Sequence, residues 1–178
     1  MRVLLHTCCA PCLAHPLEEL RSEGHEVTAF FFNPNIHPYT EYLRRLDAFA
    51  TFVRDNHVRT ISPEDPIGME EWLRQVVFRE AERCRVCHHL RLAVTARVAE
   101  SRHFDAFSTT LLYSRFQKHD LLHTLGEALA EQHKVPFLYR DWRKGWNRGV
   151  KLYRTTGLYR QKYCGCIYSE KERAEKIL

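Results

Sequence analysis

The residues most able to do chemistry in this chain of 178 residues are its seven cysteines, which fall into three groups. An odd number of cysteines cannot form a fully paired disulfide framework, and thiols in a reducing compartment serve metal binding or redox chemistry more than crosslinking. The groups are Cys8, Cys9 and Cys12, then Cys84 and Cys87, then Cys164 and Cys166. We therefore expect metal binding or thiol redox chemistry.

The first group occupies segment 8–12, which joins a predicted strand at residues 3–5 to a predicted helix at 12–22. Thiolates at this junction would face the positive end of the helix dipole, which lowers a thiol pKa and favours metal binding or nucleophilic attack. The alternative is that small buried cysteines pack the end of the strand. Cys12 is undecided. It could replace one of the ligands of a metal site, hold a second iron in addition to that site, or relay electrons.

Cys84 and Cys87 have C-x-x-C spacing near the start of a predicted helix at 80–101, so both sulfurs can reach one metal ion. With two thiolates of the first group they would complete the four ligands of a structural zinc site or of a [4Fe–4S] cluster. The spacing alone leaves both metals open.

Cys164 and Cys166 are separated by a single glycine. A pair so close cannot form the usual structural disulfide without strain, and strained disulfides are the labile, oxidising ones. The spacing favours a catalytic dithiol that opens and closes. The alternative is that the pair adds ligands to a metal.

The segment 139–166 is basic and aromatic: between residues 139 and 163 it has eight Lys or Arg, one acid and six aromatic residues. Lys and Arg bind phosphates and aromatic rings stack on unpaired bases, which is how single-stranded RNA is bound. The alternative is a solvated basic face whose aromatic residues belong to the core. The residues expected to contact RNA are Arg140, Trp142, Arg143, Lys144, Trp146, Tyr159 and Arg160.

Three further polar residues stand beside these groups. His6 precedes the first cysteine loop and His88 follows Cys87, so each could orient a ligand or transfer a proton. Asp141 lies inside the basic segment, where we expect a salt bridge to a neighbouring Arg in preference to a bond to iron.

Short apolar runs alternate with helical periodicity along the chain, which predicts an α/β fold with a mainly parallel sheet in a single domain spanning residues 1–178. Strands are expected at 3–5, 27–32, 58–61, 104–107 and 136–139, and helices at 12–22, 42–53, 72–77, 80–101 and 116–132. In the helix at 80–101 the apolar stripe is expected to be Val86, Leu90, Val94 and Val98.

Functional groups of a parallel sheet lie beyond the carboxyl ends of its strands. Cys8 and Cys9 follow the first expected strand, and segment 108–110 (Ser-Thr-Thr) follows the fourth. The two segments should therefore meet at one edge of the sheet.

Composition is that of a globular protein, with 44% hydrophobic residues and a net charge of +5. No run approaches the roughly 18 apolar residues of a membrane span, and the N-terminal apolar stretch is too short for a signal peptide. We expect a cytoplasmic protein with no membrane partner.

Six separate motifs stand out along the chain: Leu-Leu-His-Thr-Cys-Cys-Ala-Pro-Cys (4–12), Phe-Asn-Pro-Asn-Ile-His-Pro-Tyr-Thr-Glu-Tyr (32–42), Arg-Cys-Arg-Val-Cys (83–87), Ser-Thr-Thr-Leu-Leu (108–112), Tyr-Arg-Asp-Trp-Arg-Lys-Gly-Trp (139–146) and Tyr-Arg-Gln-Lys-Tyr-Cys-Gly-Cys (159–166). Together they resemble the QueH family of epoxyqueuosine reductases. One departure is Ser114-Arg115, where the family is expected to have Ser-Pro, and it puts the shape of that loop in question.

The resemblance implies a HUP-like (PP-loop-like) sandwich with a C-terminal basic extension, and the last step of queuosine synthesis. In that step epoxyqueuosine in the anticodon loop of tRNA is reduced to queuosine. The resemblance also implies a [4Fe–4S] cluster and a redox-active cysteine pair. The cluster ligands would be Cys8, Cys9, Cys84 and Cys87, and the pair would be Cys164 and Cys166.

Turning an epoxide into an alkene and water takes two electrons and two protons, and the sequence has no flavin or nicotinamide fingerprint. Our hypothesis is that an open iron, of the cluster or an additional mononuclear one, binds the epoxide oxygen, while the cysteine pair stores electrons from an external donor.

Two rival functions stay open. A PP-loop-like tRNA thiolation enzyme would need a Gly- and Ser-rich phosphate loop where this chain has its first cysteines. A zinc-stabilised RNA-binding module would carry the same cysteines without catalysis.

Overall fold

The computed structural model describes residues 1–61 and 68–177. Its described part contains one four-stranded, all-parallel sheet in the order β3-β2-β1-β4, which confirms the predicted α/β class. The strands are β1 (Arg2–His6), β2 (Glu26–Phe30), β3 (Arg59–Ile61) and β4 (Ala106–Thr109).

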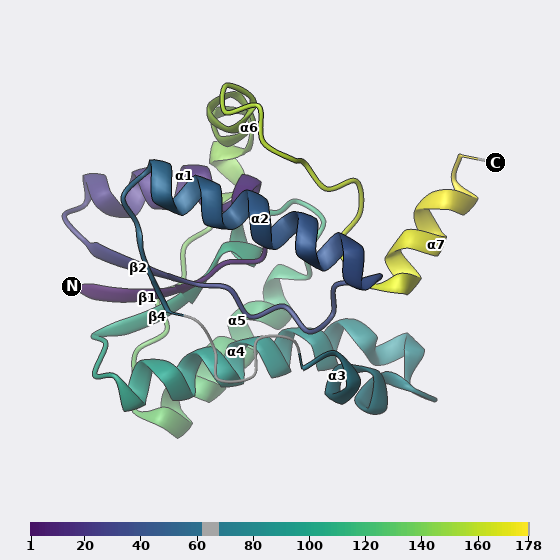
Figure 1. Ribbon diagram of the computed structural model, residues 1–178. Helices are drawn as coiled ribbons and strands as arrows, with labels where there is room; N and C mark the ends of the chain where they lie inside the picture. The colour runs from purple at the N-terminus through teal and green to yellow at the C-terminus, as the bar shows by residue number, and fades with distance from the viewer. Residues whose placement is uncertain (62–67, 178) are drawn as a thin grey trace.

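Helices cover both faces of this sheet, with α1 and α2 on one side and α4 and α5 on the other (Figure 1). Sheets covered in this way have strands that are apolar on both faces, and Leu4, Leu5 and Phe107 are accordingly inaccessible to solvent. The α-helices are α1 (Ala10–Ser22), α2 (Tyr39–Asp55), α3 (Met69–Val76), α4 (Arg83–Ser101), α5 (His119–His133), α6 (Trp146–Arg154) and α7 (Ile167–Glu175). Short 3-10 helices are η1 (Glu80–Glu82), η2 (Thr110–Tyr113) and η3 (Trp142–Gly145).

The fifth strand expected at residues 136–139 is wrong: only an isolated parallel bridge joins Phe107 to Phe137. Phe107 donates its amide to the carbonyl of Pro136 and accepts from the amide of Leu138. The carbonyl of Leu138 accepts from the Ser108 hydroxyl at 2.7 Å, and no further backbone hydrogen bond joins the described residues of this segment to β4.

The four residues expected in the apolar stripe of α4 are partly buried and pack against the hydrophobic clusters. The fully buried face also includes the polar or thiol side chains of Cys87, His88, Arg91 and Thr95. These polar residues face inward because they line or support the site described below, and the apolar stripe lies on the flank of the helix.

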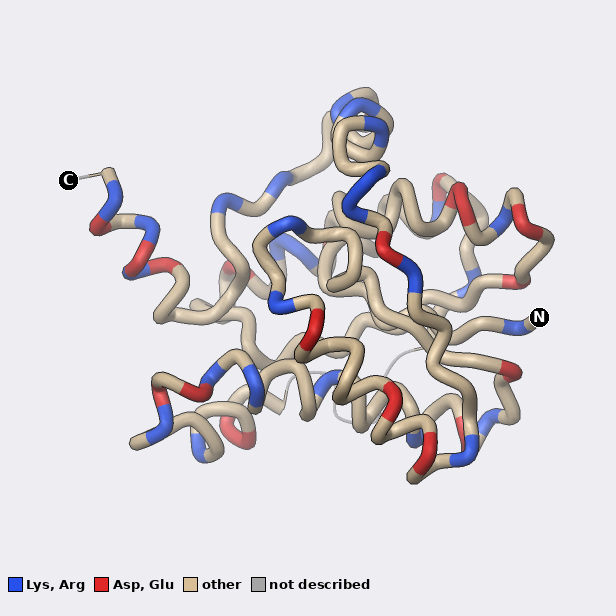
Figure 2. Tube along the Cα trace, turned by 180° about the vertical axis from the view of Figure 1, so that it is seen from behind, with Lys and Arg blue, Asp and Glu red and all other residues tan. Residues whose placement is uncertain are grey.

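The segment 142–175, which contains η3, α6 and α7, begins beside α1 and ends beyond α2 (Figure 1). Trp142 and Tyr153 are each 1% exposed and belong to the main core, so the segment packs on the sheet layers. Seen from behind, Lys and Arg positions follow one another along α6 at the top of the molecule (Figure 2). No helix in the described ranges combines the length and apolarity that crossing a bilayer requires.

Candidate metal and redox site

The loop after β1 brings three cysteine sulfurs together. Cys9 is the N-cap of α1, and the Sγ atoms of Cys8 and Cys9 lie 3.7 Å apart. The Sγ atoms of Cys8, Cys9 and Cys12 all lie within 4.8 Å of one another. Among the described residues they form the one such group of potential metal ligands. The N-terminal turn of α1 therefore presents three soft donors to a single point.

A cavity of about 730 Å³ opens over this group. Six of the seven cysteines line it: Cys8, Cys9, Cys12, Cys84, Cys164 and Cys166. The seventh, Cys87, is buried in a small apolar cluster with Trp72, Val76 and Cys166. Thus the three groups separated in sequence converge on one place, while Cys84 and Cys87 stay outside the tight group of three.

Cys8 is the thiol best prepared to be a thiolate. Its amide donates to Thr110 Oγ1 at 2.9 Å, and that hydroxyl lies 3.3 Å from its sulfur. Hydrogen bonds from the Cys12 and Cys9 thiols, together with the charge of Arg91, hold the pKa of Cys8 well below its usual range. Burial raises the pKa of Cys87 to about 12.

Arg91 is a buried cation, only 2% exposed, whose hydrogen bonds all go to neutral or sulfur acceptors. It donates to Asn33 Oδ1 at 2.6 Å, to His6 Nε2 at 3.2 Å and to Cys87 Sγ at 3.5 Å. Within the described part of the chain it has no carboxylate partner. A buried guanidinium stays charged, and burying it unpaired is costly, so it favours anionic sulfur nearby.

The two histidines singled out from the sequence are both buried and neutral. Burial and the charge of Arg91 lower the pKa of His6 to about 3, and its ring is held between Arg91 and Thr109 Oγ1. The same causes lower the pKa of His88 to about 3. His88 lines the cavity, and neither ring nitrogen has a hydrogen-bond partner among the described residues. His6 therefore positions Arg91, whereas His88 lies in the cavity wall with two buried ring nitrogens that no described residue hydrogen-bonds.

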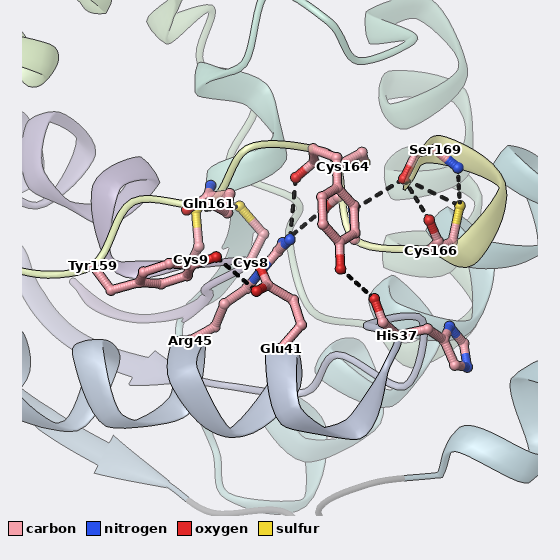
Figure 3. A network of polar contacts seen from close by, with 12 residues as sticks. Cys8, Cys9, His37, Glu41, Arg45, Tyr159, Gln161, Cys164, Cys166 and Ser169 are labelled. Atoms are coloured by element: carbon pink, nitrogen blue, oxygen red, sulfur yellow. Dashed lines mark hydrogen bonds and ion pairs between the residues drawn. The ribbon is translucent and has the colours of Figure 1, made fainter. Parts of the chain in front are cut away.

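A buried ion pair on α2 fixes the backbone of the last cysteine pair (Figure 3). Arg45 Nε donates to Glu41 Oε1 at 2.7 Å, and its other nitrogens donate to the carbonyl oxygens of Cys164 at 2.9 Å and Tyr163 at 3.1 Å. Tyr159 donates to Glu41 Oε2 at 2.6 Å. We call Glu41, Arg45 and Tyr159 the Arg45 clamp.

Amide groups reach two of the cavity sulfurs. Gln161 Nε2 donates to Cys9 Sγ at 2.7 Å, and Gln117 Nε2 donates to Cys164 Sγ at 3.3 Å. Cys166 Sγ accepts from the amide of Ser169 at 3.4 Å at the start of α7. All seven cysteines are free thiols, so a Cys164–Cys166 disulfide stays a prediction.

The residues expected to contact RNA are divided between the core, the surface and the cavity. Trp142 is buried and its indole donates to Glu19 at 2.9 Å, so its ring cannot stack on a base without leaving the core. Arg140 lies 3.5 Å from Glu23, and Lys144 is exposed away from the cavity wall.

Arg143 forms an ion pair with Asp141 at 2.6 Å, which confirms the salt bridge expected for that acid. The hydrogen bonds that Arg143 donates lower the pKa of Asp141 to about 2. Trp146 and Arg160 line the cavity, and Tyr159 belongs to the clamp.

Sequence reasoning did not single out Arg45, Arg91, Gln117 or Gln161. The spacing of Glu41 and Arg45, four residues apart on one helix, is the available signal for the clamp. Arg91 has the same spacing from Cys87, but its shorter hydrogen bonds go to Asn33 and His6 in distant segments, which the spacing does not predict.

The parallel sheet and the shared cysteine cavity define an α/β protein with a thiol-rich site suited to metal or redox chemistry. The family model described as "Epoxyqueuosine reductase QueH" matches residues 3–172. The chain therefore belongs to the epoxyqueuosine reductase QueH family and is a reductase.

Curated relatives agree over almost the whole chain. Epoxyqueuosine reductase QueH of Dehalococcoides mccartyi is 37% identical over 175 residues, which cover 98% of this chain and 96% of the relative. The protein of the same name from Thermotoga maritima is 35% identical, covering 98% and 93%. That from Streptococcus pyogenes is 34% identical, covering 95% and 70%.

Proposed function

We propose that this chain, acting as one domain, reduces epoxyqueuosine in the anticodon loop of tRNA to queuosine, the final step of queuosine biosynthesis. The observation that carries the proposal is the convergence of six cysteines on one cavity in a chain of this family. Trp146 and Arg160 in the wall of the same cavity support an RNA substrate.

The donor set fits an iron–sulfur cluster, since thiolates are its usual ligands and Arg91 supplies buried positive charge for an anionic group. We propose Cys8, Cys9, Cys84 and Cys87 as the residues that would hold a [4Fe–4S] cluster. Cys12 would remain as a donor for an additional mononuclear iron. Such a cluster, when bound, supplies electrons to the substrate one at a time.

The cysteine pair can balance the reaction. Oxidation of the Cys164 and Cys166 thiols to a disulfide releases two electrons and two protons, which convert an epoxide into an alkene and water. An external electron donor must then reduce the disulfide. The Arg45 clamp holds the backbone at Cys164, and Gln117 donates to the Cys164 sulfur, which would help to orient it.

The protein's own residues also prepare the cavity for an uncharged epoxide. The neutral ring of His88 has two buried nitrogens without a hydrogen-bond partner among the described residues, and a small rotation of the ring would bring one of them to the substrate. Trp146 and Arg160 would contact the nucleotide, and Arg140, Arg143 and Lys144 would meet RNA phosphates further out. We exclude Trp142 from this contact set because its ring is buried.

The test is anaerobic purification, followed by iron, sulfide and zinc analysis and a visible spectrum before and after dithionite. About four irons and four sulfides with an absorbance that bleaches would support the proposal, followed by conversion of epoxyqueuosine-tRNA. Zinc alone after reconstitution would favour a zinc-stabilised RNA-binding module. Cys164→Ser should abolish turnover and keep the cluster absorbance, and full activity would contradict the electron-storage role.

A further inference from the structure

One wall of the cavity is built by the loop 114–118 between η2 and α5, outside the basic segment. Phe116 lies on this wall and yet is 84% exposed. Burying a large aromatic side chain is favourable, so an exposed one at the mouth of a cavity indicates a surface that contacts a ligand.

Phe116 packs against Trp146, which is itself held by Tyr113. The ring of Trp146 stacks on Tyr113 with centroids 5.1 Å apart and planes 22° apart, and the Tyr113 hydroxyl donates to the Trp146 carbonyl at 2.8 Å. Phe116 meets Trp146 edge to face, at 5.9 Å and 83°. This contact covers little of the Phe116 ring, since the residue remains 84% exposed.

Three cations lie beside Trp146 or along the wall of the same cavity. The guanidinium of Arg115 lies 5.7 Å from the Trp146 ring centroid, and Lys118 and Arg160 line the same cavity. None of these three cations forms an ion pair within the residues that the structure describes. Cations without acidic partners beside an accessible aromatic face are what an unpaired nucleotide of RNA requires.

We propose that Phe116 stacks on an unpaired base next to the nucleotide held in the cavity. It would thereby act as a specificity-determining residue that favours RNA over the free nucleoside. This inference rests on the proposed function, from which the RNA substrate comes. The new element is the base contact at Phe116, with Arg115 and Lys118 placed to meet the neighbouring phosphates.

The experiment measures binding of the full-length protein to a labelled, unmodified anticodon stem–loop RNA by fluorescence anisotropy. Phe116→Ala should weaken binding about tenfold, within the range that loss of one stacked base produces. Phe116→Tyr keeps the aromatic face and should bind as the unaltered protein does. The matched control is Phe78→Ala, since Phe78 is 93% exposed and does not line the cavity.

A second probe is a fully paired RNA duplex of equal length. It distinguishes the contribution of base stacking to binding from the contribution of charge. Phe116→Ala should leave duplex binding unchanged, because paired bases offer no free face at this point. In turnover of epoxyqueuosine-tRNA the same variant should raise KM with kcat unchanged.

Equal loss on both RNAs, or no loss on the stem–loop, would overturn the role of Phe116 and leave the proposed function intact. Failure of the unaltered protein to bind any stem–loop would overturn the RNA substrate itself. The two failures are therefore distinguishable.

Discussion

The guanidinium of Arg45 donates to the carbonyl oxygen of Cys164 at 2.9 Å, across 119 positions of sequence. The same guanidinium forms a buried ion pair with Glu41, in which the two side chains are 2% and 6% exposed. One side chain of α2 thus fixes the backbone of a cysteine that lines the cavity. The position of that cysteine depends on a charge pair far from it in sequence.

Arg45→Met should lower the free energy of unfolding by about 3–5 kcal/mol, because it leaves the Glu41 carboxylate buried without its cation. Urea denaturation measures the change. The matched control is Arg54→Met on the same helix, whose ion pair with Asp55 is exposed and should be worth less than about 1 kcal/mol. Equal losses for the two variants would contradict the clamp.

Gly165 has φ +149°, and a Cβ built there would lie 2.9 Å from Asn35 Nδ2 and 3.3 Å from an Arg45 guanidinium nitrogen. Gly165→Ala should therefore displace the loop and speed alkylation of Cys164 by a maleimide. Gly157→Ala is the control, because Gly157 also has positive φ but no atom within 4 Å of the added Cβ. If both variants alkylate at the rate of the unaltered protein, the loop is not held as described.

Asp141 should titrate as a salt-bridged acid and not as a metal ligand. Its hydrogen bonds to Arg143 lower its pKa from 3.8 to about 2 in the folded protein. The pair therefore contributes stability that is present above about pH 3.8 and is lost as the pH falls through about 2. Carbon-13 NMR of the carboxyl measures this titration.

Asp141→Asn supplies the second measurement for that residue. Iron content should be unchanged in the variant, because Asp141 does not line the cysteine cavity. Loss of iron would show that the acid is a ligand.

The sequence sufficed to predict the parallel sheet and the cysteine loop after its first strand. Strand and helix order are local properties, and Cys8 lies two residues after β1 while Cys9 caps α1. Placing functional groups at one edge of the sheet also predicted that Cys8 and segment 108–110 meet, and the Cys8 amide donates to Thr110 Oγ1.

What the sequence could not provide depends on tertiary packing. Hydrophobic periodicity did not reveal the buried polar face of α4, because Arg91 and Thr95 occupy buried positions that apolar residues usually fill. Composition could not separate Trp142, which is buried, from Trp146, which lines the cavity, since both lie in the same basic segment. The exposed ring of Phe116 had no signal beyond its residue type.

Cys12 and Cys84 differ in their relation to Cys8 and Cys9, and this difference makes the proposed ligand set testable. Cys12 shares the tight group of sulfurs, whereas Cys84 faces the same cavity from outside that group. A [4Fe–4S] cluster spans more space than a single ion, so its ligands need not converge as closely as the first three sulfurs do.

Under the proposed set, Cys84→Ser should lose most of the iron and sulfide, since a cluster with three remaining thiolates is held less firmly. Cys12→Ser should keep about four irons and four sulfides under the same anaerobic reconstitution, and Cys164→Ser serves as the control for a cavity thiol outside the set. The reverse pattern, with iron lost from Cys12→Ser and kept in Cys84→Ser, would replace Cys84 by Cys12 as a ligand. In that case Cys84 would be the free thiol that faces the substrate. Turnover of Cys84→Ser and Cys164→Ser would then show which of the two thiols stores electrons.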